Sequence, residues 1–403
     1  MKKITYLLSL SFMLISAYTA DAQCTITGNL DFRSQTDIDN WVPPCSQITV
    51  TGFVNVQGAT ITDISKLANI VQIGSYLQFR TIAASVTSFA PLANITSIGG
   101  ALVIRDCDGI TSIAPLGGIT SLGGALNVRD NLNLTSLNGL GNLVNPSFTG
   151  GITIFNNTAL TDISAINYGP INGFLEINSN PALTSLGTLS SITSITGLLK
   201  IKLNSLLTNL SGLSGLTTVG GNVEIDSNNA LTSISGLSSL TSAGGGLFVR
   251  TNPLLPNLTG LNSLASIGGA LDVKDNLALR NLCGLNALVA SNTFTSYVVT
   301  GNGYNPLVGD FPTSCQDPTL STANFKSFDF LYYPNPVNQG EFYISTQANG
   351  VKSVQIFDVV GKQVYSKRIE ANEKVKTSNL GTGVYFLKVE ENGKVATSKL
   401  IVN

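Results

Sequence analysis

The side chains that could perform chemistry in this chain are carboxylates, lysines, arginines and tyrosines, because the chain contains no histidine. This excludes Ser-His-Asp and Cys-His catalysis, imidazole acid–base chemistry and histidine metal sites. Charged residues make up only 11% of the chain and the formal net charge is −1, so no basic field would attract nucleic acid. We therefore expect a protein that is not an enzyme, that has no cofactor or metal site and that does not bind nucleic acid.

Charged and aromatic side chains recur in one column, at intervals of 23 to 26 residues. The members that we select as candidate ligand contacts are Arg80, Arg105, Arg129, Phe155, Lys202, Arg250 and Lys274. The first three would stack like charges on adjacent repeats, which would suit an acidic glycan or a carboxylate-bearing partner. In the alternative interpretation, Asp106 and Asp130 beside them neutralise the stack.

A second column carries amides in place of charges. Its members are Cys107, Asn131, Asn157, Asn180, Asn204, Asn228, Asn252 and Asn276. A buried Asn offers both donors and an acceptor, so it can pair with backbone groups that have no partner in a sheet. We therefore expect this column to form a structural ladder between adjacent repeats.

The cysteines lie mainly near the ends of the repetitive region. Cys24 and Cys45 bracket the first segment, and Cys283 and Cys315 bracket the last repeat and its tail. We expect these two pairs to form disulfides, which an exported protein can keep. Cys107 has no such partner and is predicted to be a buried free thiol. No C-x-x-C spacing suggests metal binding.

The elements that must position these columns are repeats of about 24 residues. The segments GGNVEIDSNNALTSISGLSSLTSA (220–243) and GGGLFVRTNPLLPNLTGLNSLASI (244–267) show the pattern. Val223 and Ile225 alternate with polar residues, which indicates a strand with one buried face. The following apolar residues recur every three positions, without the mixed spacing of a helix. The pattern therefore predicts that each repeat forms one short parallel strand and two compact faces with little helix.

These motifs resemble the leucine-rich repeat, in which L-x-L is followed by Asn or Cys at this offset. The next apolar residue comes three positions after the ladder residue (Asn228 to Leu231), which favours the receptor L-domain type over the helix-backed horseshoe. The resemblance implies a mainly all-β chain: a right-handed parallel β-solenoid of about ten coils. A small antiparallel β-sandwich is expected to follow it.

The two ends of the chain predict export. Lys2 and Lys3, an apolar stretch and Ala20-Asp21-Ala22 have the order of a signal peptide. No later segment is long and apolar enough to span a membrane. From about residue 330 the repeat gives way to alternating strands separated by Gly and Asn-Gly turns.

This C-terminal part resembles the type A sorting domain of the type IX secretion system. The residues that carry the resemblance include Pro334, Asn335, Pro336, Asp358, Gly361, Lys362, Gly383 and Tyr385. The resemblance implies that the secretion machinery is a partner, and that the protein passes through the periplasm to be secreted or displayed on the outer cell surface. We expect a signal peptide (1–22), an N-terminal cap (23–53), the solenoid (54–291), a C-terminal cap (292–315), a linker (316–330) and the sorting domain (331–403).

The expected function is binding or adhesion, to an extracellular protein or glycan, through the exposed face of the strands. One alternative is a polysaccharide-active enzyme of the lyase type, although no Asp/Glu cluster interrupts the repeat. Another is an ice- or surface-binding solenoid. Its support is a threonine column, made up of Thr111, Thr135, Thr161, Thr184, Thr208 and Thr232.

Overall fold

The computed structural model describes residues 23–144, 148–311, 313–317, 330–346, 348, 350–370 and 373–403. The predicted signal peptide, residues 1–22, lies outside the described residues, as does most of the predicted linker. The chain divides into two compact units, one ending at Asp317 and the other starting at Pro318. The first is the repetitive region, and the second contains the sandwich.

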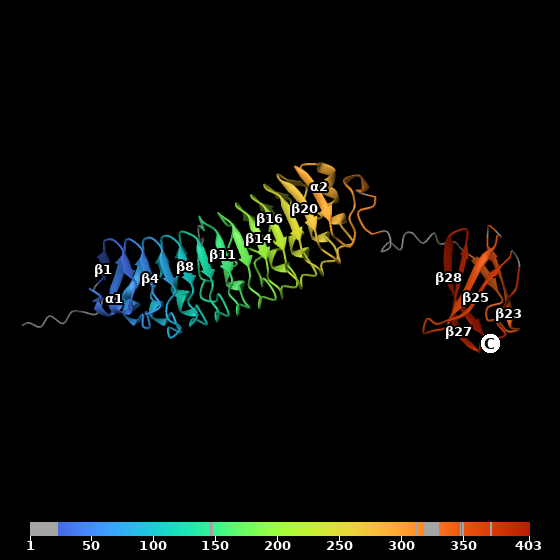
Figure 1. Cartoon of the computed structure of the whole chain (residues 1–403), viewed down its shortest axis with the longest axis horizontal. Coiled ribbons are helices and arrows are strands. Elements are labelled where there is room, and N and C mark those ends of the chain that lie inside the picture. The colour runs from blue at the N-terminus through green and yellow to red at the C-terminus, as the bar shows by residue number, and fades with distance from the viewer. Residues whose placement is uncertain are drawn as a thin grey trace, which may run out of the picture. The chain divides into compact units, whose positions relative to one another are not determined.

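The repetitive region is a β-solenoid built on a parallel sheet of twelve strands. The strands lie side by side along the stack (Figure 1). They are β2 (Leu30–Phe32), β4 (Val54–Gln57), β6 (Leu77–Arg80), β8 (Leu102–Arg105), β10 (Leu126–Arg129), β11 (Ile152–Phe155), β12 (Leu175–Asn178), β14 (Leu199–Lys202), β16 (Val223–Asp226), β18 (Leu247–Arg250), β20 (Ala270–Lys274) and β21 (Ser296–Thr300). The sheet therefore extends beyond residues 54–291 at both ends.

The other two faces of each coil are compact, as the three-residue period predicted. One face carries parallel strands of two to four residues in two separate sheets. These are β1 (Gln23–Ile26), β3 (Gln47–Val50), β5 (Ile70–Ile73), β7 (Ser97–Ile98) and β9 (Ser121–Leu122), then β13 (Ser194–Ile195), β15 (Thr218–Val219), β17 (Ser242–Ala243) and β19 (Ser266–Ile267). The remaining face carries single 3₁₀ turns: η1 (Ser65–Asn69), η2 (Ala90–Leu92), η3 (Ala114–Gly118), η4 (Ser164–Ile166), η5 (Ser211–Leu213), η6 (Ser235–Leu237), η7 (Thr259–Leu261) and η8 (Cys283–Leu285).

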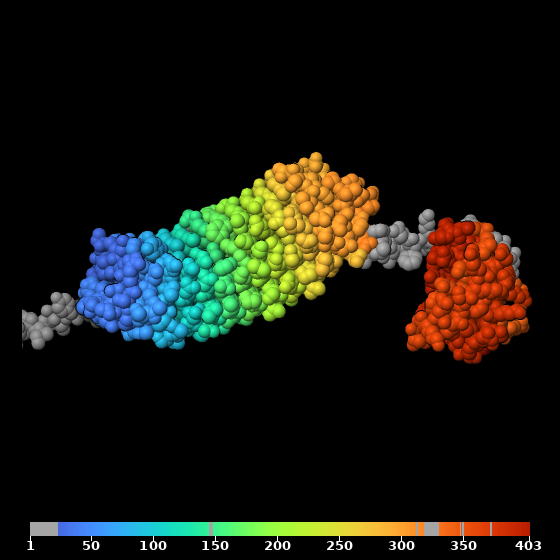
Figure 2. All heavy atoms as spheres, viewed as in Figure 1, coloured from blue at the N-terminus to red at the C-terminus, as the bar shows by residue number. Residues whose placement is uncertain are grey.

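The interior of the solenoid is one continuous aliphatic core. Val223 and Ile225 are fully buried, and so are the residues of the three-residue period that follow, such as Leu231 and Leu237. Figure 2 shows the coils packed against one another with no separation between successive repeats. Because each coil buries its apolar side chains against its neighbours, the stability belongs to the array and not to a single repeat.

Both ends of the array are closed by short helices and disulfides. Near the start, α1 (Gln35–Asn40) buries Ile38, and its first turn is held by a capping box between Ser34 and Asp37. At the other end, α2 (Asn286–Ser291) follows η8, and η9 (Val308–Asp310) lies beyond β21. The two predicted disulfides, Cys24–Cys45 and Cys283–Cys315, are both formed.

Cys107 is a buried free thiol, as predicted. Burial raises the pKa of this thiol to about 12, so it stays protonated and unreactive at neutral pH. Its Sγ donates a hydrogen bond to the carbonyl of Arg105, and its N–H donates to Oδ1 of Asn131. Cys107 therefore occupies the first position of the amide ladder as a small structural residue.

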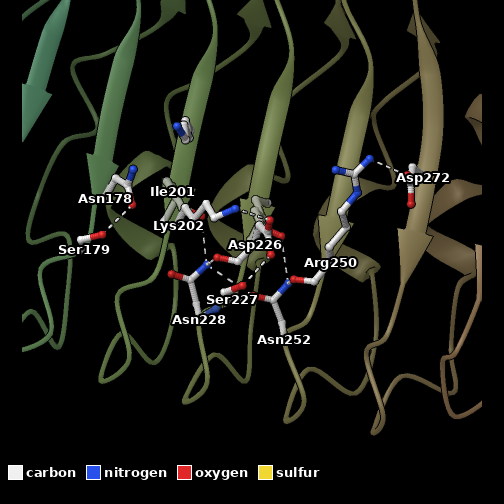
Figure 3. A network of polar contacts seen from close by, with 12 residues as sticks. Asn178, Ser179, Ile201, Lys202, Asp226, Ser227, Asn228, Arg250, Asn252 and Asp272 are labelled. Carbon is white, nitrogen blue, oxygen red and sulfur yellow. Dashed lines mark hydrogen bonds and ion pairs between the residues drawn. The ribbon is translucent and has the colours of Figure 1, made fainter. Parts of the chain in front are cut away.

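The asparagine column lies inside the solenoid, directly after each strand turns inward. Asn228 shows the pattern: its N–H donates to Oδ1 of Asn252, and its Nδ2 donates to the carbonyls of Ile201 and Asp226 (Figure 3). Its own Oδ1 accepts the N–H of Asn204 at 3.1 Å. The column thus links adjacent coils through buried hydrogen bonds, which leaves its amides occupied and out of reach of a ligand.

Each ladder residue is preceded by a residue in the left-handed backbone region. This residue turns the chain inward, and it is never Gly in the coils between β6 and β20. Most of these positions hold Asp, Asn, Ser or Thr, but one holds Leu203, whose φ is 55°. A left-handed conformation costs most L-residues about 1–2 kcal/mol, and Asn tolerates it better.

Leu203→Asn is therefore expected to raise the free energy of unfolding by about 0.5–1 kcal/mol, because Asn relieves part of this backbone cost. Leu203 is 46% exposed, so the loss of apolar burial is small. Urea denaturation would measure the change. Leu206→Asn is the matched control, since Leu206 is 51% exposed but lies outside the left-handed region. An equal effect at both positions would contradict the backbone explanation.

The second unit is an antiparallel β-sandwich of two sheets. One sheet contains β22 (Phe330–Tyr333), β23 (Glu341–Thr346) and β26 (Val375–Lys376). The other has the order β25 (Gln363–Ile369), β24 (Lys352–Phe357), β27 (Gly383–Glu391) and β28 (Lys394–Val402). Phe342, Val354 and Leu387 lie in its small core.

Candidate ligand-binding face

The candidate site is the strand face, which we define as the outward-pointing side chains of the twelve-stranded sheet. Side chains alternate along a strand, so the second and fourth residues of each four-residue strand point outward, together with the residue just before it. Adjacent strands pair without a shift, for example Val223 with Leu247 and Asp226 with Arg250. Equivalent side chains therefore stand next to each other in straight columns about 4.8 Å apart.

The predicted arginine stack is largely neutralised. Nε of Arg105 lies 3.1 Å from Asp106 and 3.4 Å from Asp130, and Nε of Arg129 lies 2.9 Å from Asp130. The guanidinium of Arg129 also lies over the ring of Phe155, with 5.3 Å to the centroid. The structure thus favours the interpretation in which Asp106 and Asp130 balance Arg105 and Arg129.

Asp130 is held in its charged form by these neighbours. Burial alone would raise the pKa of its carboxyl group. Hydrogen bonds from Asn156 and Arg129, together with the charges of Arg129 and Arg105, outweigh burial and lower the pKa below its usual value. Both ion pairs therefore persist at neutral and mildly acidic pH.

The rest of the predicted column is mostly paired as well. Lys202 donates to Asp226 on the next strand at 2.9 Å, and Arg250 binds Asp272 (Figure 3). Asp272 is only 8% exposed, and Arg250 also covers the ring of Phe248 at 4.5 Å. These contacts fix the side chains against the sheet, so they act first as cross-strand pairs.

Two predicted residues differ from the others. The side chains of Arg80 on β6 and Lys274 on β20 make no ion pair or hydrogen bond within the described residues. They stand near opposite ends of the strand face. Arg80 and Lys274 are therefore the members of the column whose charge remains available to a ligand.

Three aromatic residues that were not predicted as site residues lie immediately before strands of the sheet: Phe53, Tyr76 and Phe174. The same column holds Ala101, Ala125 and Gly151 between the last two. Phe53 and Tyr76 stack with their ring centroids 4.6 Å apart and their planes only 8° from parallel. Phe174 places its ring against Gly151, where an added Cβ would lie 2.9 Å from Cγ of the ring. Extending the alternation by one residue toward the N-terminus would have revealed this column.

The threonine column is exposed, and its hydroxyls bond within the solenoid. Hydroxyls of this column donate to the backbone carbonyl of the threonine one coil earlier, for example from Thr135 to Thr111 at 3.1 Å and from Thr232 to Thr208 at 3.1 Å. These side chains therefore join adjacent coils, in the manner of a second ladder.

Metal-binding side chains do not gather anywhere in the part of the chain that the structure describes: it contains no group of three or more acidic or cysteine residues placed to hold an ion. The described residues also contain no helix long and apolar enough to cross a membrane.

The predicted sorting-motif residues form turns in the sandwich. Oδ1 of Asp358 accepts the N–H groups of Val360 and Lys362, and Gly361 has a φ of 86° in the same turn. The hydroxyl of Tyr385, which is two residues after Gly383, donates to the carbonyl of Gly381 at 2.9 Å.

The segment that contains Pro334 and Pro336 is tied to the last strand through Asn335. Its Oδ1 accepts the N–H of Ile401 at 2.8 Å, and its Nδ2 donates to the carbonyl of Lys399. Both X-Pro bonds of this segment, Tyr333–Pro334 and Asn335–Pro336, are cis. Asn335 thus ties this segment to β28.

Two family models match the chain. Residues 331–403 match the secretion system C-terminal sorting domain, and residues 169–235 match the receptor L domain. No curated protein matches the chain. The sorting domain marks the chain as cargo of the type IX secretion machinery, exported to the cell surface or the extracellular space, and the L-domain match points to ligand binding.

Proposed function

We propose that this exported chain is a non-catalytic binding or adhesion protein that recognises an extracellular protein or glycan through the strand face. The observation that carries the proposal is the in-register sheet of twelve parallel strands, whose outward columns present aromatic rings, amides and charges. Such a surface is extended and rigid, so it suits recognition of a long or repetitive partner.

Two observations support binding over catalysis. Most charged side chains on the strand face are held in cross-strand pairs, such as Lys200 with Glu176 at 3.0 Å. No histidine is present, and no group of candidate metal ligands occurs within the described residues. An ion pair favours the charged form of a carboxylate, so these groups are poorly suited to donate a proton as a general acid.

The test is to screen the purified chain against glycan and protein arrays, and then to alter the strand face. Thr153→Arg combined with Glu224→Arg places two large side chains on outward positions of β11 and β16. Binding to the array ligand is expected to fall at least about tenfold, because these side chains obstruct contact with the sheet.

Ser214→Arg combined with Ser238→Arg is the matched control, since both serines are exposed on the 3₁₀ face of the coils. This variant is expected to bind normally. Equal loss in both variants would contradict a site on the strand face, and shortening of a bound glycan during incubation would contradict a non-catalytic role.

A further inference from the structure

We propose that the N-terminal part of the strand face, at Tyr76, Gln78 and Arg80, binds a saccharide that carries a carboxylate. The inference rests on the proposed function and names the chemical class of its ligand. All three residues point outward from one strand, β6, or from the position just before it. A ligand lying along β6 would meet all three.

Each of these three side chains keeps at least one polar group without a partner among the described residues. The hydroxyl of Tyr76 donates no hydrogen bond within the described residues, and the residue is half-buried. Gln78 donates its amide nitrogen to Asn55 at 2.9 Å, and Asn55 in turn donates to Asp31 at 2.7 Å. These two hydrogen bonds fix the side chain of Gln78 and leave its amide oxygen as an oriented acceptor.

Arg80 carries the uncompensated charge of this region. Its neighbours in register are Gln57 on β4 and Arg105 on β8. Arg105 forms ion pairs with Asp106 and Asp130, and Asp130 also pairs with Arg129. Three arginines thus share two carboxylates, and the remaining positive charge lies on Arg80. An anionic group is therefore the complement that this end of the face lacks.

The ring of Tyr76 lies next to a part of the strand face that carries short side chains. Its distance of 4.6 Å from the ring of Phe53 is close to one strand spacing, so the two rings stack along the axis of the array. The second face of Tyr76 consequently looks toward the next coil. There the two outward positions nearest the ring hold short side chains, Ala101 and Val103, ahead of Arg105, and the coil after that continues with Ala125.

The arrangement matches the parts of an acidic sugar. A sugar ring has an apolar face that can lie against Tyr76, and hydroxyl groups that can donate to Oε1 of Gln78. A carboxylate suits the planar fork of Arg80, which can donate two parallel hydrogen bonds. A carboxylate from a protein side chain would use Arg80 but would have no flat ring to place against Tyr76.

The test measures binding of the full chain to three acidic oligosaccharides, built respectively of galacturonate, mannuronate and glucuronate units, by calorimetry. At least one is expected to bind, and its methyl-esterified form, which keeps the shape but lacks the charge, is expected to bind much more weakly. Arg80→Gln should weaken binding of the acid by about 10- to 100-fold, as expected for the loss of a charge-assisted pair. Tyr76→Ala should weaken binding of the acid and of its ester alike.

Lys274→Gln is the matched control, because Lys274 is also unpaired on the strand face but lies near the other end. It should bind as the unaltered chain does. Equal binding of acid and ester, or no effect of Arg80→Gln, would overturn the proposal, as would failure of all three acids to bind. Hexaglutamate serves as a carboxylate without a sugar ring, and tighter binding of this peptide would assign the site to a protein partner.

These outcomes separate the two proposals. If the array ligand is lost in the Thr153→Arg/Glu224→Arg variant but no acidic saccharide binds at Arg80, the strand face is a binding surface for another ligand class. If the array ligand is retained both in that variant and in Arg80→Gln, which lies on β6 away from β11 and β16, the proposed function itself fails.

Discussion

Removal of residues 331–403 is expected to leave the protein in the periplasm, with the solenoid still folded. The deleted part is the whole sorting domain, and it belongs to a compact unit separate from the solenoid. Cell fractionation, combined with protease treatment of intact cells and detection by an antibody against the solenoid, would measure the change. The intact chain should appear on the surface or in the medium without its C-terminal domain. Surface exposure of the truncated chain would contradict the expectation.

A pair of point variants would show whether export depends on the folded domain. Leu387 is fully buried in the sandwich core, so Leu387→Asp should unfold the domain and reproduce the deletion. Thr397 is exposed on β28, so Thr397→Asp should leave export unchanged. Normal export of the Leu387→Asp chain would indicate that a linear segment suffices.

Asn228→Ala is expected to lower the free energy of unfolding by about 2–5 kcal/mol, since buried groups that lose a partner cost about 1–3 kcal/mol each. The substitution removes the acceptor of the Asn204 N–H and the donor to the carbonyl of Ile201. Asn228 is fully buried, so water cannot replace these bonds without opening the coil. Urea denaturation, with hydrogen exchange at the neighbouring coils, would measure the loss.

Asn229→Ala is the control for this ladder variant. Asn229 is the next residue in the same coil and is exposed, so its loss should change stability by less than about 0.5 kcal/mol. Similar effects of the two substitutions would show that the asparagines of the column are ordinary turn residues and do not stabilise the stack.

Much of the fold could be predicted from the sequence because the residues that define each coil recur at a nearly constant spacing. The alternation at Val223 and Ile225 identified the strand, and the three-residue spacing from Leu231 excluded a helix. The ladder was recognisable because amides recur at one offset, although a single Asn would have carried no meaning. The very short strands, such as β17, have only two residues and leave no alternation to detect.

The candidate site could be predicted less well, because it depends on pairing across coils. Asp130 forms ion pairs with Arg129 on its own coil and with Arg105 on the coil before. Only the register of the sheet shows which arginine remains unpaired. The ring of Tyr76 lies before the strand and gains its role from Phe53, a coil earlier. The start of the array was also missed, since Leu30 and Phe32 already form a strand that pairs with β4.

The C-terminal disulfide decides which part of the solenoid would bear a pull applied to the chain beyond it. Tension on the chain beyond Asp317 reaches Cys315 within two residues and can pass through the sulfur–sulfur bond to Cys283. The segment between them, including β21, then lies outside the path of the force. Tension therefore enters at η8, where Leu285 is fully buried, so the array resists being peeled open from its last strand.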